Sequence, residues 1–211
     1  MNRRLMRNTT IITLCALFSI FSNHDALAQA RKTGAAAAAA AAQSSGGVGV
    51  TVKLLEITKV RTPDFSYSSS TTEANIIPGE WAKMLVRFDT DADWTDQVEM
   101  RFYIVVKNSK TAAYTMLTGT YVYSDIPKGR NHMVAVYLRP RTMDRYGNIV
   151  EQVAVEVYSK GDVVSSGSFP VSNKPWWRTA TVRSVEGYVL DRSQTPFANI
   201  AGDNYELPKG K

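Results

Sequence analysis

The chain has 211 residues and a formal net charge of +6 at pH 7, with one cysteine and two histidines. A single cysteine excludes an intramolecular disulfide framework, and so few cysteines and histidines exclude zinc sites built from several of them. The basic residues form no concentrated stripe, so nucleic acid is not an expected partner.

Residues 1–28 have the pattern of a signal peptide. Arg3, Arg4 and Arg7 form a positive n-region, an apolar run follows at residues 11–21, and Ala26-Leu27-Ala28 supplies a small-x-small cleavage pattern. The apolar run is shorter than the roughly 20 residues that a transmembrane helix requires. We therefore expect cleavage after Ala28 and export to the periplasm, the outer membrane surface or the extracellular space, with no transmembrane segment in the mature chain.

Cleavage after Ala28 would remove Cys15 and His24, leaving His132 as the single histidine of a cysteine-free chain. A multi-histidine metal site is then excluded, and we expect no cofactor. His132 follows the turn sequence Lys128-Gly129-Arg130-Asn131 and is interpreted as a surface histidine. The mild positive charge that remains is compatible with anionic surfaces but does not require them.

Residues 29–49 predict a disordered linker. They contain eight consecutive alanines, at residues 35–42, between Gly34 and a Ser/Gly-rich stretch. Alanine favours helix, but an isolated helix shorter than about 12–15 residues is marginal in water. We expect a tether with transient helix that separates the folded part from whatever lies at the N-terminus.

From residue 50 onward the hydrophobic pattern has a period of two residues. It is clearest at residues 97–108, where Val98, Met100, Phe102, Ile104 and Val106 alternate with polar or charged neighbours. Only a half-buried strand explains this spacing. The pattern predicts about seven strands, at residues 50–57, 81–90, 97–108, 114–123, 133–139, 149–158 and 163–169.

Short strands separated by turn signals predict an all-β fold, an immunoglobulin-like or fibronectin-like β-sandwich spanning residues 50–171 without a disulfide. A barrel is the alternative, because periodicity does not say whether the sheet closes. Residues 172–211 form a C-terminal extension that we expect to pack on the domain and cover a sheet edge, with one more strand within residues 181–190.

The stretch FDTDADWTD, residues 88–96, places four carboxylates close together. Asp89, Asp91, Asp93 and Asp96 could supply oxygen ligands to calcium. An EF-hand is excluded because Trp94 and Met100 stand where that loop needs glycine and glutamate. A calcium site between two sandwich loops is the remaining metal hypothesis, and the alternative is a solvated connection between strands 81–90 and 97–108.

Aromatic side chains suggest a second kind of site. Trp176 and Trp177 could form a flat platform for sugar rings, joined by Tyr121 and Tyr123. The alternative is that these aromatics belong to the core. A hydrolase would need only two facing carboxylates, but no pair in the sequence is distinguished as catalytic, so we expect a non-enzymatic protein.

The tail sequence GYVLDRSQTPFANIAGDNYE, together with the signal peptide, the alanine linker and the cysteine-free strands, resembles a small group of exported proteins. These are encoded beside type IV pilus-like genes in gut-mucus bacteria. The resemblance implies an immunoglobulin-like fold and a place in or near a surface appendage, and it implies no site residues. Pilins keep a long apolar N-terminal helix, whereas here the apolar run is short and expected to be cleaved, which favours an accessory protein.

The leading functional hypothesis is therefore a secreted or outer-surface protein that mediates protein–protein contact, with partners in a cell-surface or pilus-like assembly. Acceptance of a partner's strand at an exposed sheet edge is one route to such contact. The alternative hypothesis is a glycan-binding module, with host glycans or receptors as ligands. A carboxylate-pair hydrolase is the third.

Overall fold

The computed structural model describes residues 49–63 and 79–209. The predicted signal peptide and all of the predicted linker except Gly49 lie outside these residues. Among the described residues, no helix is both long and apolar enough to cross a membrane.

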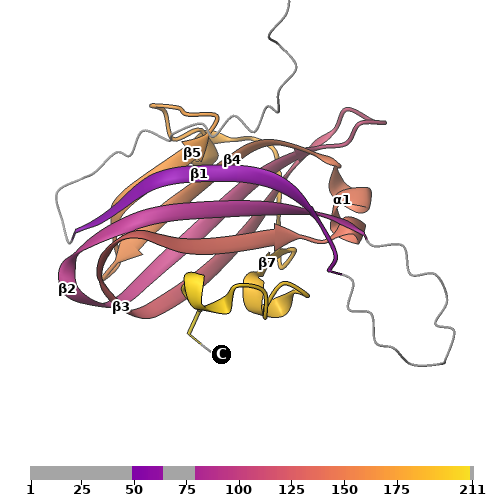
Figure 1. The fold of residues 1–211 in the computed structure, drawn as a ribbon. Coiled ribbons are helices and arrows are strands. Elements are labelled where there is room, and N and C mark those ends of the chain that lie inside the picture. Colours follow the sequence, from indigo (N-terminus) through magenta and orange to yellow (C-terminus); the bar gives the residue numbers. More distant parts are fainter. Residues whose placement is uncertain (1–48, 64–78, 210–211) are drawn as a thin grey trace, which may run out of the picture. The chain divides into compact units, whose positions relative to one another are not determined.

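Two long, bent strands organise the fold. β2 runs over Glu80–Lys107 and β3 over Tyr114–Leu138. Each joins two segments that the sequence predicts as separate strands, so the acidic stretch 88–96 is not the loop that we expected. Its pairing with β3 is irregular between Phe88 and Trp94, and such bulges bend a strand and increase its twist. Figure 1 shows β2 and β3 turning together at this end.

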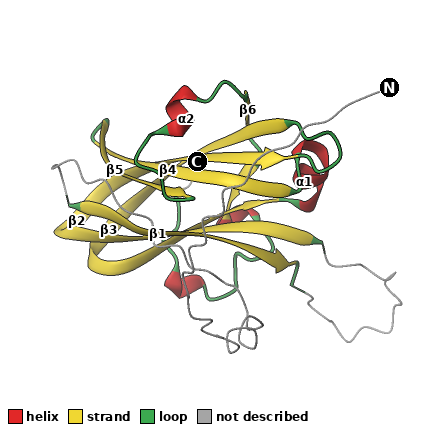
Figure 2. Cartoon of the chain, turned by 90° about the horizontal axis from the view of Figure 1, so that it is seen from above, coloured by secondary structure: helices red, strands yellow, loops and turns green. Residues whose placement is uncertain are grey.

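In the part of the chain that the structure describes, the bend folds one seven-stranded sheet into two layers. In the first layer, β1 (Val50–Arg61) pairs with β2 up to Thr90, and this half of β2 also pairs with the end of β3. In the second layer, β2 from Glu99 onward pairs with β4 (Ile149–Ser159), which pairs with β5 (Asp162–Phe169). Figure 2 shows the β4–β5 layer above the β1 layer.

The all-β, sandwich-like architecture predicted from the sequence is confirmed. The two layers also approach each other where β1 lies against β5. There the Val52 amide donates to the Ser165 hydroxyl at 3.0 Å, although β1 and β5 form no ladder within the described residues. The sheet is therefore open at this seam and is not a closed barrel.

The core lies between the two layers. It is filled by the side chains of every second strand residue, which point inward. Along β2 the even-numbered residues on both sides of the bend point inward, and Met84, Val86, Phe88, Val98, Met100, Phe102, Ile104 and Val106 are all 0% exposed. Burying each such side chain stabilises the fold by about 1.5–3 kcal/mol. The odd-numbered residues after the bend face outward, and they build the candidate site.

The C-terminal extension packs on both layers. After α1 (Pro140–Tyr146), β4 and β5, the chain forms α2 (Trp176–Thr179), which lies outside the β4–β5 layer (Figure 2). β6 (Arg183–Glu186) pairs in parallel with the start of β3, and β7 (Val189–Asp191) pairs antiparallel with its end. The predicted strand 181–190 is thus two strands, separated at Gly187.

Two 3₁₀ turns, η1 (Arg192–Gln194) and η2 (Gly202–Asn204), complete the extension. Phe197 packs between Trp81 and Tyr137 in a second, smaller cluster on the outer side of the first layer. Aromatic burial of this kind explains how a polar tail is held against the domain.

Candidate functional site

The outward face of the second layer carries a groove formed by two adjoining pockets. The pocket near the bend has a volume of about 510 Å³, and the one toward β6 has a volume of about 850 Å³. Glu99 and Arg101 of β2 line both pockets, so the two are continuous. We call this surface the outer groove.

Trp94 stands at the bend end of the outer groove and is 65% exposed. It lies in the irregular part of β2, where the alternation that buries Phe88 and Val98 is broken. Its neighbour Thr95 also lines the pocket but is only 4% exposed, and its hydroxyl has no hydrogen-bond partner among the described residues.

The middle of the outer groove is a charged and aromatic cluster. Arg101 Nε donates to Glu99 Oε1 at 2.6 Å, and its guanidinium lies 4.0 Å from the centre of the Tyr158 ring. The hydrogen bond to Glu99 raises the pKa of Arg101 above its usual value. Arg101 therefore remains charged and is held flat against Tyr158, with 43% of its side chain exposed.

A buried carboxylate beside this cluster anchors α2. Glu156 of β4 is 1% exposed and accepts from Arg178 Nε at 2.6 Å, Tyr158 at 2.8 Å and Tyr103 at 3.1 Å. Burial opposes ionisation of Glu156, but the hydrogen bonds from Tyr158 and Arg178 and the charge of Arg178 help to hold the pKa of Glu156 below its usual value. The ion pair between Glu156 on β4 and Arg178 on α2 therefore ties the extension to the second layer.

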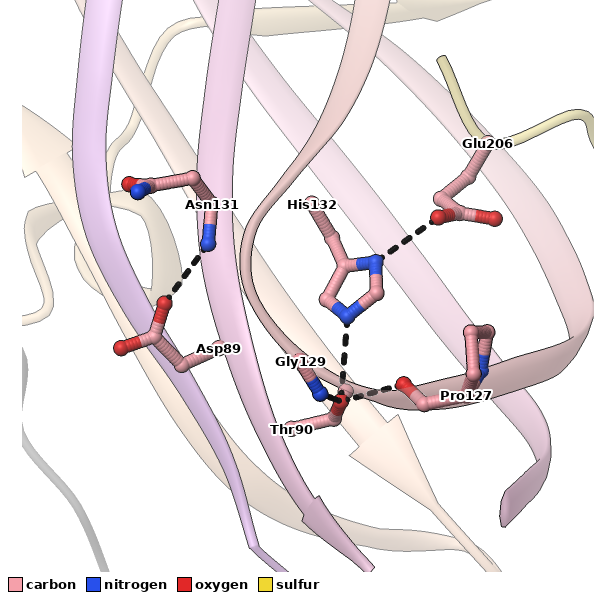
Figure 3. A network of polar contacts seen from close by, with 7 residues as sticks. All are labelled: Asp89, Thr90, Pro127, Gly129, Asn131, His132 and Glu206. Carbon is pink, nitrogen blue, oxygen red and sulfur yellow. Dashed lines mark hydrogen bonds and ion pairs between the residues drawn. The ribbon is translucent and has the colours of Figure 1, made fainter. Parts of the chain in front are cut away.

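The single histidine of the predicted mature chain lies in a second network, which Figure 3 shows. His132 Nδ1 is 2.8 Å from Glu206 Oε1, and Nε2 is 3.2 Å from Thr90 Oγ1. The His132 side chain is only 11% exposed. The interpretation as a surface histidine is therefore wrong, because the extension brings Glu206 over it.

Thr90, His132 and Glu206 have the order of a hydroxyl–imidazole–carboxylate triad, but they cannot act as one. The Thr90 hydroxyl donates to the Pro127 carbonyl at 2.7 Å and accepts from the Gly129 amide at 3.0 Å. His132 Nε2 must then donate to Thr90, whereas a triad base accepts from its nucleophile. Thr90 is also 2% exposed, so substrate cannot reach it.

The four aspartates of the calcium hypothesis lie along the bend of β2. Asp89 accepts from the Asn131 amide at 2.9 Å and lies 3.6 Å from Lys53 Nζ, while the Asp93 side chain is 95% exposed. Within residues 49–63 and 79–209, no group of three or more His, Cys, Asp or Glu side chains could hold a metal ion. The bend therefore separates carboxylates that are adjacent in sequence.

The four aromatics of the glycan hypothesis do not form one platform. Trp177 is 6% exposed and stacks on Tyr103, and Tyr123 is 0% exposed in the core. Tyr121 faces β7, and its hydroxyl donates to the Val189 carbonyl at 2.6 Å; burial raises the pKa of Tyr121 to about 12. Sequence reasoning missed Trp94, although a tryptophan among four aspartates, where alternation fails, is a visible signal.

Comparison with known proteins gives the context of this groove. A search of curated proteins found no match. A crystal structure of a protein from Akkermansia muciniphila is similar with a TM-score of 0.67 and 22% sequence identity, covering 81% of this chain and 99% of that one. At this identity the likeness establishes the fold alone. A family model of pilus-associated proteins matches residues 40–211. Because that match spans well over half of the sequence, the chain belongs to this pilus-associated family.

Proposed function

We propose that this protein is a non-enzymatic surface component that binds another protein of a pilus-like assembly through the outer groove. Family membership indicates a surface or exported protein. The observation that carries the proposal is Trp94, which is 65% exposed next to the stacked pair of Arg101 and Tyr158. Trp, Tyr and Arg are the residues that most often dominate the binding energy of protein interfaces.

The dimensions and charges of the outer groove fit a polypeptide segment. Along β2, the distance from Trp94 to Tyr103 is roughly 30 Å at about 3.3 Å per residue. Acidic and basic side chains alternate on the walls, with Asp96 and Glu99 near Arg101 and Lys160. A partner segment of mixed charge would be complementary to such a surface, and Trp94 would supply the apolar anchor.

A site-specific crosslink tests this proposal in the native cell. A photoreactive phenylalanine replaces Trp94, and the control carries the same group at Leu207, which is 60% exposed but lies outside the outer groove. We expect position 94 to trap a discrete envelope protein that position 207 does not trap. With that protein purified, Trp94→Ala should weaken binding at least about tenfold, since an interface tryptophan commonly contributes 2 kcal/mol or more. Equal crosslinking of the same envelope protein at positions 94 and 207 would refute the proposal.

Glycan binding is the second candidate, and Trp94 again favours it. Its exposed ring could stack on a sugar, and the Asp96 and Glu99 carboxylates could accept hydrogen bonds from sugar hydroxyls. A glycan array probed with the wild type and with Trp94→Ala separates the two candidates. Binding to a defined sugar that is lost in Trp94→Ala favours the glycan. No binding to any sugar on the array favours the protein partner.

A further inference from the structure

Another pocket lies between α1 and the connection from β6 to β7, beside the β6 end of the outer groove, with which it shares Gly187 and Leu190. Its volume is about 280 Å³, and it is lined by Arg139, Arg141, Thr142, Arg145, Gly187, Tyr188 and Leu190. We propose that this arginine pocket binds a sulfate or phosphate ester carried by a larger ligand. The inference does not rest on the proposed function, because the residues that carry that proposal, Trp94, Arg101 and Tyr158, do not line this pocket.

Two segments far apart in the chain build the arginine pocket. Arg139 caps α1, and Arg141 and Arg145 are four residues apart, so they share one side of the helix. Opposite them, Gly187 has φ of +85°, a conformation that glycine adopts without strain. This turn brings the Tyr188 ring edge-on to Tyr146 at 4.8 Å between ring centres.

The positive charges of the pocket are not compensated within the chain. Among the described residues, none of the three arginines forms an ion pair, and neither does Asp144, the acidic residue of α1. Asp191 at the end of β7 is buried and accepts from the Ser193 amide. The lining therefore presents three guanidinium groups and no carboxylate, a composition that attracts an oxyanion.

Arg145 is already held in place. Its Nη1 donates to the Tyr188 hydroxyl at 3.3 Å, and its guanidinium lies over the rings of Tyr146 and Tyr188. Arg139 and Arg141 also line the pocket, and both are exposed to solvent. Planar guanidinium groups bind tetrahedral oxyanions through paired N–H donors.

The size of the arginine pocket indicates more than a bare ion. A volume of about 280 Å³ exceeds what a sulfate or phosphate group alone would fill, since one water in the liquid occupies about 30 Å³. Leu190 and Tyr188 give apolar walls against which a sugar ring or a headgroup could rest. The shared chemistry is a tetrahedral ester, and its source is either a sulfated sugar or a phospholipid.

The test uses the full chain and three probes: inorganic sulfate, a sulfated hexasaccharide, and vesicles containing phosphatidylglycerol. Side-chain Nε–Hε NMR signals of Arg139, Arg141 and Arg145 should shift together when sulfate is added. Affinity for the hexasaccharide or the vesicles should fall about tenfold or more in Arg139→Gln/Arg141→Gln, because each charged hydrogen bond contributes about 1.5–3 kcal/mol. Whichever of the two probes loses binding identifies the source of the ester.

Arg130→Gln/Lys110→Gln is the matched control, because it removes two exposed positive charges outside the arginine pocket. We expect it to bind within about twofold of the wild type at the same salt concentration. Equal losses in the control and the pocket variant would mean that net charge alone acts, and would overturn the proposal. So would the absence of binding to all three probes.

Discussion

The buried carboxylate of Glu156 is the most informative residue to perturb. Glu156→Gln keeps the shape of the side chain but leaves one acceptor oxygen where two now serve Arg178, Tyr103 and Tyr158. Either the arginine or the tyrosine pair then loses its acceptor. A hydrogen bond to a charged group contributes about 1.5–3 kcal/mol, so the free energy of unfolding should fall by about 3 kcal/mol. In a chain of this size that corresponds to a melting temperature lower by roughly 6–12 °C.

Urea denaturation followed by tryptophan fluorescence measures this change, because Trp177 stacks on Tyr103 beside the carboxylate. Arg178→Gln is the companion variant. The Arg178 side chain is 52% exposed, so solvent screens its charge and we expect a smaller loss, of about 1–2 kcal/mol. In the double variant the losses should not add, because both remove the same contact.

The pH dependence gives an independent check. The folded-state pKa of Glu156 lies below its usual value of 4.5. Its ionised form therefore contributes stability that is fully present above about pH 4.5 and is lost as the pH falls through the folded-state pKa. The wild type and Glu156→Gln should converge in stability on acidification. Equal stability at pH 7 within about 0.5 kcal/mol, or a difference that stays constant as the pH is lowered until the protein unfolds, would refute this account of the network.

Three further perturbations test other parts of the structure. A Cβ at residue 129 would lie 2.7 Å from His132 Nε2, so Gly129→Ala should displace the imidazole. Urea titration should show a free energy of unfolding that is lower by about 1–3 kcal/mol. An unchanged chemical environment of His132 in NMR would contradict this prediction. Phe197→Ala should lower the free energy of unfolding by about 3–5 kcal/mol, because Phe197 is 8% exposed and stacks on Tyr137. The C-terminal extension should then become accessible to limited proteolysis. An unchanged cleavage pattern would contradict this prediction. Calcium should shift the melting temperature by less than about 1 °C, and a larger shift that disappears in Asp91→Ala would restore the metal hypothesis.

The sequence by itself determined the local features of the domain. Alternation along residues 97–108 identified which side chains of β2 enter the core, because the two-residue period of a strand is a local property of the backbone. The same alternation could not distinguish a loop from a bulge at residues 88–96, since both interrupt the pattern. The two-layer architecture was therefore predictable, whereas its construction from two bent strands was not.

Only the tertiary structure decided which side chains meet. His132 and Glu206 are 74 residues apart in sequence, and the arginine pocket requires α1 to face the β6–β7 connection. Trp177 is buried and Trp94 is exposed, because the extension covers one face of the sheet but does not cover Trp94 at the bend. Such contacts depend on pairing between distant segments, and no local pattern encodes that pairing.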